Sequence, residues 1–212
     1  MAIFSAPLGR WSGSLALSMS LLAGCSDPAS KVPQSSASAP QSASSSSDGA
    51  GKPYVIRPGS TLQFTGSKVT GSHNGGFTNF SGTLPVSGGK IVGNPTIQID
   101  MASTWADVDR LTGHLKSPDF FDVAKFPQST FAVTSVEPPG PDGKSKITGN
   151  LTLHGVTKSI AFPATVQVSD EAATLKADFA INRKDFGIVY PGKPDDLIRD
   201  NVVIRFDLRA SP

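Results

Sequence analysis

The final stretch of the chain carries the pattern that most restricts its fold. In residues 202–209 every second side chain is apolar, and Arg205, Asp207 and Arg209 separate the later apolar ones. An apolar residue at every second position is typical of a β-strand with one buried face and one face in water. The same alternation recurs in residues 62–64, 97–101, 131–133, 151–153, 162–168 and 175–181. The chain is therefore predicted to consist mainly of strands.

Turn-forming residues separate these stretches. Residues 138–143 read Pro-Pro-Gly-Pro-Asp-Gly, and His154-Gly155 forms a tight link between two of the predicted strands. Clean alternation predicts an antiparallel sheet with one wet face and one dry face. Roughly eight strands at regular spacing are typical of either a sandwich or a closed barrel. The fold class is all-β, and the pattern leaves these two architectures open.

Residues 104–126 interrupt the strand pattern. Ser117 is a good residue for a helix N-cap, and Pro118 suits the first helical position. We therefore predict a short helical insertion near residues 105–125, which crosses an opening of the sheet.

The N-terminus resembles a bacterial lipoprotein signal. Arg10 precedes a short, almost uncharged run, and small residues precede Cys25, which is the only cysteine in the chain. This layout is typical of a secretory signal. It is too short for a membrane-spanning helix, which needs about 20 apolar residues. In a lipobox the chain is cut before the cysteine, which then carries the lipid. Residues 1–24 are predicted to be a signal peptide, and Cys25 a lipidation site.

The remaining chain divides into a linker and one domain. Residues 25–52 join Cys25 to a Ser/Ala/Pro-rich stretch in which Val32 is the only large apolar residue. Such a composition predicts disorder, because it offers too little apolar surface to offset the entropy of ordering. We interpret it as a spacer between the membrane and the domain. Residues 53–212 suit a single domain that buries roughly 70% of its unfolded surface.

Charge and motifs favour binding over catalysis. The formal net charge of +2 gives no sign of a nucleic-acid partner. His73, His114 and His154 are far apart in sequence, so no metal site is predicted. No hydrolase elbow, phosphate loop or zinc-protease motif is present. Residues 71–76 are glycine-rich, lie between two strand-like stretches and suggest a mobile hairpin.

Phenylalanine is the prominent aromatic residue, with 12 copies against two each of Trp and Tyr. Phe supplies bulk without a polar group, so it suits either a packed core or an apolar ligand site. An eight-stranded barrel is wide enough to be filled by its own side chains or to hold one ligand. The sequence pattern by itself leaves both uses open.

Four ordered motifs resemble the YceI-like domain family. They are His-Leu-Lys-Ser-Pro-Asp-Phe-Phe-Asp-Val at 114–123, Gly-Asn-Leu-Thr-Leu-His-Gly-Val-Thr-Lys at 149–158, Ile-Asn-Arg-Lys-Asp-Phe-Gly at 181–187 and Phe-Thr-Asn-Phe-Ser-Gly-Thr at 77–83. The resemblance covers residues 53–212. It implies an eight-stranded antiparallel lipocalin-like barrel with an apolar interior that holds a long isoprenoid chain, such as a quinone tail.

The resemblance also implies roles for individual residues. His114 is expected at the head-group end, and Arg183 with Asp185 is expected to form a structural polar corner. The family pattern has a basic residue near the place of residues 72–76, so this departure is expected near an opening of the barrel. The residues expected to bind the ligand are Phe77, Phe80, His114, Phe120, Phe121, Phe126 and Phe186.

The sequence therefore predicts a non-enzymatic envelope lipoprotein. Its partners would be a long-chain lipid, bound as a polyisoprenoid or quinone, and the membrane that holds Cys25; the resemblance also allows a homodimer. Ser26 after Cys25 resembles the sorting signal for the outer membrane, facing the periplasm. Two alternatives stay open. One is a filled barrel with a structural or interaction role, and the other is an enzyme that acts on a lipid head group with His114 or His73 as base.

Overall fold

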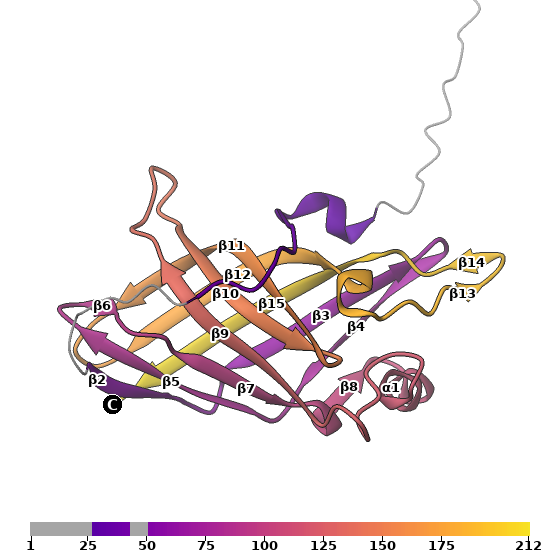
Figure 1. Cartoon of the computed structure of the whole chain (residues 1–212), viewed down its shortest axis with the longest axis horizontal. Coiled ribbons are helices and arrows are strands. Elements are labelled where there is room, and N and C mark those ends of the chain that lie inside the picture. The colour runs from indigo at the N-terminus through magenta and orange to yellow at the C-terminus, as the bar shows by residue number, and fades with distance from the viewer. Residues whose placement is uncertain (1–26, 43–50) are drawn as a thin grey trace, which may run out of the picture.

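The computed structural model describes residues 27–42 and 51–212 (Figure 1). The predicted signal peptide, Cys25 and residues 43–50 of the predicted linker lie outside the described residues. Across the described part, no helix is both long and apolar enough to cross a membrane.

The strands form a closed antiparallel barrel of eight strands, so the barrel rather than the sandwich is confirmed. β12 (Ala173–Asn182) closes the ring by pairing with β15 (Asn201–Ser211). The ring of eight consists of β12 and β15 together with β2 (Lys52–Ile56), β5 (Phe80–Ser87), β7 (Thr96–Asp100), β9 (Gln128–Val136), β10 (Ser145–Leu153) and β11 (Val156–Val168). Two further strands extend this wall: β3 (Thr61–Lys68) pairs with the part of β15 before the residues that pair with β2, and β4 (Gly71–Phe77) pairs with β3.

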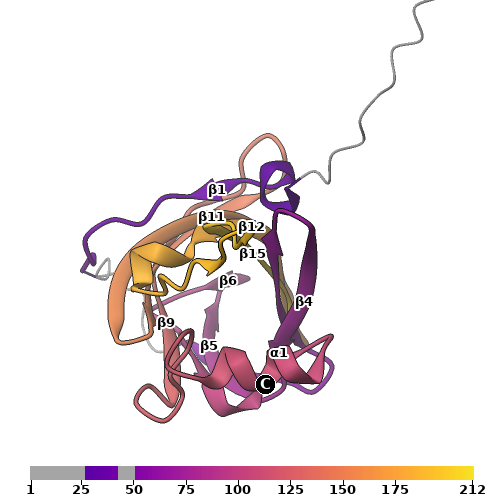
Figure 2. The ribbon, with the colours of Figure 1, turned by 90° about the vertical axis from the view of Figure 1, so that its right-hand side faces the viewer.

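Shorter elements complete the ends of the barrel. Figure 2 views the barrel from the end that carries α1 and the β13–β14 hairpin. These elements are β6 (Lys90–Ile91), η2 (Met101–Ser103), β8 (Thr104–Ala106), α1 (Asp109–Lys116), η3 (Arg183–Phe186), β13 (Gly192–Lys193) and β14 (Asp196–Leu197).

The alternating stretches of the sequence all lie in strands of the wall, apart from Met101, which begins η2. The predicted tight link at His154-Gly155 is also confirmed. His154 and Gly155 have φ values of 52° and 74°, the conformation that a two-residue hairpin needs to match the twist of its strands.

The helical insertion is confirmed, but its predicted N-cap is wrong. Ser117 ends α1 rather than starting a helix, and its N–H donates to the His114 carbonyl at 3.1 Å. A residue before proline avoids the helical conformation, so Pro118 forces the helix to end at Ser117. The start of α1 is fixed instead by Thr112, whose hydroxyl accepts the Ala106 N–H at 2.8 Å.

The prediction of disorder is wrong for residues 27–42, which we call the N-terminal strap. The strap contains η1 (Pro28–Lys31) and β1 (Gln34–Ser35) and lies on the outside of the barrel beside β11 and β12 (Figure 2). Ala29 and Val32 pack against Ala180 and Val203, so even a stretch with few apolar residues finds a place for them.

The strap is ordered because the barrel wall leaves backbone groups for it to bind. β11 and β12 pair with each other only over residues 165–168 and 173–176 and then diverge. The Ala180 N–H donates to the Pro33 carbonyl at 2.9 Å on the β12 side. On the β11 side, Ser38 and Ser159 exchange two backbone hydrogen bonds of 2.9 and 3.0 Å. The strap therefore joins the two strands where their direct pairing stops.

We predict that Ser38→Pro destabilises the domain. Proline removes the N–H that binds the Ser159 carbonyl, and an unmet buried hydrogen bond costs about 1–3 kcal/mol. The measurement is the midpoint of urea unfolding. Ser38→Ala keeps the N–H and serves as the control, for which we expect a midpoint close to that of the wild type. Equal midpoints for all three chains would show that the strap does not contribute to stability.

Candidate functional site

The barrel encloses an apolar cavity of about 190 Å³. Its wall comes from residues of β3, β4, β5, β7, β9, β10, β11, β12 and β15, together with α1 and the loop after it. Almost no polar atom reaches its surface. The main lining residues are Leu62, Phe64, Phe77, Phe80, Ile97, Ile99, Leu115, Phe120, Phe121, Phe131, Leu151, Leu153, Phe162, Phe179, Val202, Ile204 and Phe206.

Three aromatic rings meet in the part of the cavity nearest α1. Phe64, Phe77 and Phe121 have ring centroids 5.8–6.1 Å apart and are tilted or edge-on to each other. Gly75 makes room for them, because a Cβ there would collide with the Phe64 ring and come within 2.6 Å of the Trp105 carbonyl. Residues 71–76 lie in strand β4 and form one arm of the β3–β4 hairpin, so the hairpin is confirmed and its mobility stays a prediction.

Four phenylalanines, which we call the aromatic floor, close the far end of the cavity. They are Phe131, Phe162, Phe179 and Phe206. Phe162 and Phe179 stack at 4.0 Å with an angle of 6° between their rings, and Phe206 packs edge-on against both. Phe131 packs on the other side of Phe162 at 5.6 Å. A second cavity of only about 30 Å³ lies beyond, and Phe131, Phe162 and Phe206 line both.

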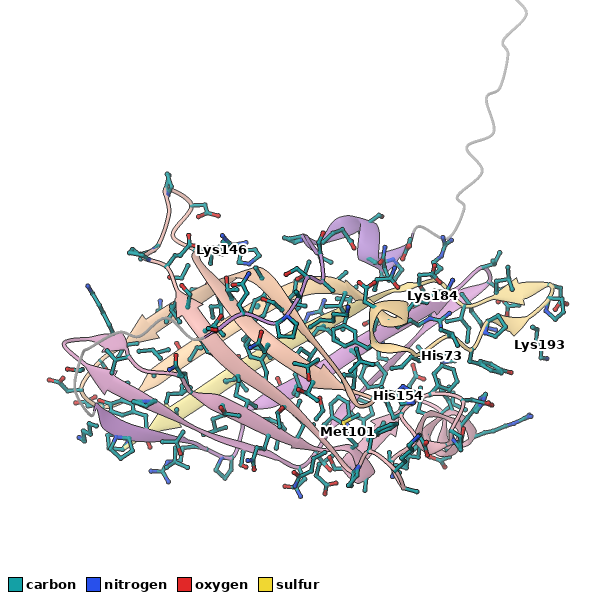
Figure 3. All side chains as sticks on the ribbon, viewed as in Figure 1. His73, Met101, Lys146, His154, Lys184 and Lys193 are labelled. Carbon is teal, nitrogen blue, oxygen red and sulfur yellow. The ribbon has the colours of Figure 1, made fainter. Side chains whose placement is uncertain are left out.

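An open depression of about 290 Å³, which we call the mouth, adjoins the opposite end of the cavity. Phe64, Leu115 and Phe120 line both the mouth and the cavity. The mouth is more polar than the cavity, and its other lining residues include Lys68, His73, His114, Tyr190, Lys193 and Asp196. His73 and Lys193 are both seen at this end of the barrel in Figure 3.

His114 sits between aromatic and acidic neighbours at the mouth. Its ring lies edge-on to Phe120 at 4.9 Å and to Tyr190 at 5.0 Å. Its Nε2 forms a hydrogen bond of 2.8 Å with an Asp119 carboxylate oxygen. This arrangement holds the imidazole at the boundary between the apolar cavity and water.

His73 also pairs with a carboxylate. Its Nδ1 lies 2.9 Å from an Asp107 oxygen, and the other Asp107 oxygen accepts the Asn74 N–H at 2.8 Å. The Asn74 N–H and, to a smaller extent, His73 hold the pKa of Asp107 below the ordinary range of an aspartate. Asp107 therefore fastens the chain just before α1 to β4.

Asp196 fastens the β13–β14 hairpin to the turn between β3 and β4. Its carboxylate binds the Lys68 ammonium and accepts the Thr70 N–H at 3.1 Å. The bond from Lys68 lowers the pKa of Asp196, with a smaller contribution from Thr70. These contacts hold two loops together at the rim of the mouth.

Comparison with known proteins identifies the family. The model of the YceI-like domain matches residues 54–210. The chain belongs to the YceI-like domain family. Its relatives include a UPF0312 protein of Pseudomonas putida, 35% identical over 126 residues, which are 56% of this chain and 65% of that protein. The match thus spans less than two thirds of that relative.

Solved structures share the YceI-like fold. BcnA of Burkholderia cenocepacia is 26% identical and superposes with a TM-score of 0.65 over 72% of this chain and 97% of its own. A polyisoprenoid-binding domain from Saccharophagus degradans is 20% identical, with a TM-score of 0.61 over 74% of this chain and 97% of its own. The second likeness shows the fold alone.

Most of the ligand-binding residues expected from the YceI-like motifs come together. Phe77, Phe80, Phe120 and Phe121 lie on the cavity wall, and His114 lies at the mouth. In the insertion, Phe121 reaches the cavity because the loop folds back under α1, with the Phe121 N–H donating to the Leu115 carbonyl at 3.0 Å.

The prediction that Phe126 and Phe186 line the interior is wrong. Phe126 packs on the His154-Gly155 turn, with its ring centroid 4.8 Å from that of His154. The Phe186 side chain, in η3, is fully buried and packs in the main hydrophobic core. Neither is among the residues that line the cavity or the mouth.

Arg183 occupies a polar corner, as expected, but Asp185 is not its partner. The buried guanidinium donates to the carbonyls of Ile188 at 2.8 Å, Arg199 at 3.1 Å and Ile198 at 3.3 Å. The carboxylate that faces it is Asp200, at 3.7 Å. Burial lowers the pKa of Arg183, and Asp200 partly opposes this effect. Arg183 therefore fixes the chain that leads from η3 to β15.

Sequence reasoning missed Tyr190 and the aromatic floor. Tyr190 follows the motif at 181–187 by only three residues and is one of two tyrosines, which are rare beside the phenylalanines. A ring with one polar end suits a boundary between apolar and wet surroundings, so this residue type was a usable signal. No metal ion is indicated within residues 27–42 and 51–212, where no three His, Cys, Asp or Glu side chains gather suitably.

We predict that Asp107 gives the domain part of its stability against acid. Because its pKa is lower in the folded chain than in the unfolded chain, its contribution is complete above the unfolded pKa of about 4 and fades as the pH falls through the folded value. Thermal unfolding followed from neutral pH down to strongly acidic pH measures this. Asp107→Asn should show a weaker loss of stability on acidification than the wild type. Parallel curves for the two chains would contradict the assignment.

Proposed function

We propose that this YceI-like domain binds one long-chain lipid of the isoprenoid type, with its tail in the cavity and its head group at the mouth. The observation that carries the proposal is an apolar cavity inside the barrel that adjoins a more polar mouth and shares lining residues with it. Removing apolar surface from water contributes about 25 cal/mol per Å², so a long hydrocarbon tail is a strongly favoured occupant. The polyisoprenoid-binding domain of Saccharophagus degradans, which has the same fold, supports the isoprenoid class.

The mouth suits a head group that accepts hydrogen bonds. Tyr190 offers a hydroxyl beside His114, at the point where the apolar wall ends. Lys68, His73 and His114 each already face a carboxylate. Among the basic residues that line the described mouth, only Lys193 has no ion pair, so little uncompensated charge remains and a weakly charged head group, such as a quinone ring, is favoured over a strongly anionic one.

We also propose that the domain works at a membrane in the cell envelope. Support comes from the lipobox-like residues before Cys25, which would give a lipid anchor, and from the sorting pattern at Ser26. An outer-membrane position facing the periplasm fits a lipid carrier.

The two alternatives are less well supported. The filled barrel conflicts with a cavity that is bordered by side chains from most strands of the wall. The enzyme alternative required a histidine held by a carboxylate at the mouth, and both His73 and His114 meet that requirement. However, within the described mouth the imidazoles of His73 and His114 form hydrogen bonds with carboxylates, and neither imidazole bonds a hydroxyl or thiol that could act as a nucleophile. The YceI-like family is one of binding proteins, which favours binding.

We predict that Phe121→Asp removes the bound lipid. The substitution places a carboxylate in an almost entirely apolar cavity, where burial of the charge is unfavourable and the one lining guanidinium, that of Arg183, is already bound to three carbonyls. The measurement is mass spectrometry of organic extracts from chains purified without detergent. Phe126→Asp, in the same loop but outside the cavity, is the matched control and should retain lipid. Circular dichroism confirms folding, and equal lipid content in a folded Phe121→Asp chain would rule out the cavity as the site.

We predict that the aromatic floor limits tail length. Phe131→Ala would join the main cavity to the small one beyond and should shift the extracted lipids to longer chains. Val133 lies two residues away on β9 and lines only the small cavity, so Val133→Ala is the control that leaves the floor intact. Loss of a core ring costs about 3–5 kcal/mol, so Phe131→Leu provides a milder second variant. An unchanged length distribution in both Phe131 variants would refute the limit.

A further inference from the structure

We propose that the rim of the mouth is the face that rests on a lipid bilayer, so that a lipid enters the cavity directly from the membrane. This inference rests on the proposed lipid-binding function and adds the orientation of the protein.

Exposed apolar side chains collect at the rim. Among the described residues, five large hydrophobic side chains are substantially exposed, and three of them are next in sequence to residues that line the mouth. Val69, in the β3–β4 turn, is 56% exposed, Val189, after η3, is 63% exposed, and Leu197, in β14, is 50% exposed. Val69 and Leu197 lie side by side, since the Val69 N–H donates to the Leu197 carbonyl at 3.3 Å. We call these three side chains the rim patch. Apolar side chains on the tips of separate loops suit the boundary of a bilayer better than they suit water.

The rim patch is held in place by its surroundings. Asp196 ties the two loops that carry Val69 and Leu197 through its bonds to Lys68 and Thr70. Because these two segments are fastened to each other, the exposed side chains of Val69 and Leu197 are held near one another. Val189 follows directly after the buried Ile188, which packs with Phe64 and Phe120 at the mouth.

The charges near the rim largely neutralise one another. Lys68 pairs with Asp196, and Lys184 pairs with Asp200 at 2.9 Å. Lys193, at the tip of β13, extends from this end of the barrel, and its charge is balanced in number by Asp195, two residues later in the same hairpin (Figure 3). The rim therefore favours insertion of apolar tips into a bilayer of any charge, rather than attraction to an anionic surface.

The strap places the predicted anchor beside the rim patch. Asp27 accepts a hydrogen bond of 3.3 Å from the Ser67 hydroxyl and lies 3.8 Å from the Arg199 guanidinium. Val69 is two residues after Ser67, and Cys25 is two residues before Asp27. Two residues span at most about 7 Å, so an acylated Cys25 would be close enough to share a bilayer with the rim patch. A spacer over residues 26–52 would have allowed any orientation, whereas an ordered strap limits it.

The test uses the full chain reconstituted into phosphatidylcholine vesicles. Val69→Cys and Val55→Cys are labelled with an environment-sensitive thiol dye, and spin-labelled phospholipids quench the dye wherever it enters the bilayer. Val55 is the matched control, because it is an exposed valine on β2, at the far end of the barrel from β13 and β14 (Figure 1). We expect strong quenching at position 69 and little at position 55, with or without added anionic lipid.

Several outcomes would overturn the proposal. They are equal quenching at both positions, no quenching at either, and quenching that requires anionic lipid. The wild-type chain is the labelling blank: an acylated Cys25 takes up no dye, and dye at Cys25 would show that the anchor is absent. Mass spectrometry of lipid extracted from the same chains reports separately on the cavity. An empty cavity with quenching at position 69 would refute the proposed function and leave the docking face standing.

A second measurement connects docking to lipid entry. A Val69→Asp/Leu197→Asp variant should take up lipid from vesicles several-fold more slowly than the wild type, but reach the same final occupancy, because neither residue lines the cavity. Unchanged uptake rates would show that the rim patch plays no part in lipid entry.

Discussion

Closure of the sheet between β12 and β15 is the constraint on which the rest of the structure depends. These strands pair from Ala173 with Ala210 to Asn182 with Asn201, and this pairing turns an open sheet into a barrel. A barrel of eight strands has an interior that side chains can only just fill. Whether a cavity remains is therefore decided by the size and direction of the inward side chains.

Unequal filling of this interior creates the site. At the end away from the mouth, the aromatic floor and a compact set of aliphatic side chains occupy the space. Towards the mouth, Phe64, Phe77 and Phe121 stand apart around a cavity, and the loop after α1 covers them. The result is a one-ended apolar chamber whose opening is marked by His114 and Tyr190. The same end carries the rim patch and receives the start of the strap, so lipid binding and membrane contact would share one surface.

Much of the fold could be predicted from local sequence. The alternation in residues 202–209 depends only on which side chains face the core, and β15 appears there. The His154-Gly155 turn follows from two residues that tolerate positive φ. The strap was missed because its order depends on backbone groups that β11 and β12 leave unpaired, which no local composition reveals. Ser117 was misread because a serine before proline suits both the end of one helix and the start of another.

The sequence by itself determined the all-β class, the family and four of the phenylalanines that line the cavity, because strand alternation and motif order are properties of neighbouring residues. Only the tertiary structure decided which phenylalanines face the cavity. Phe121 and Phe126 are five residues apart in one loop, yet the fold turns one into the cavity and packs the other on a distant hairpin. The tertiary structure also places Asp200, and not the expected Asp185, beside the Arg183 guanidinium. The physical reason is that a side chain's environment depends on contacts between strands far apart in sequence, which exist only once the barrel has closed.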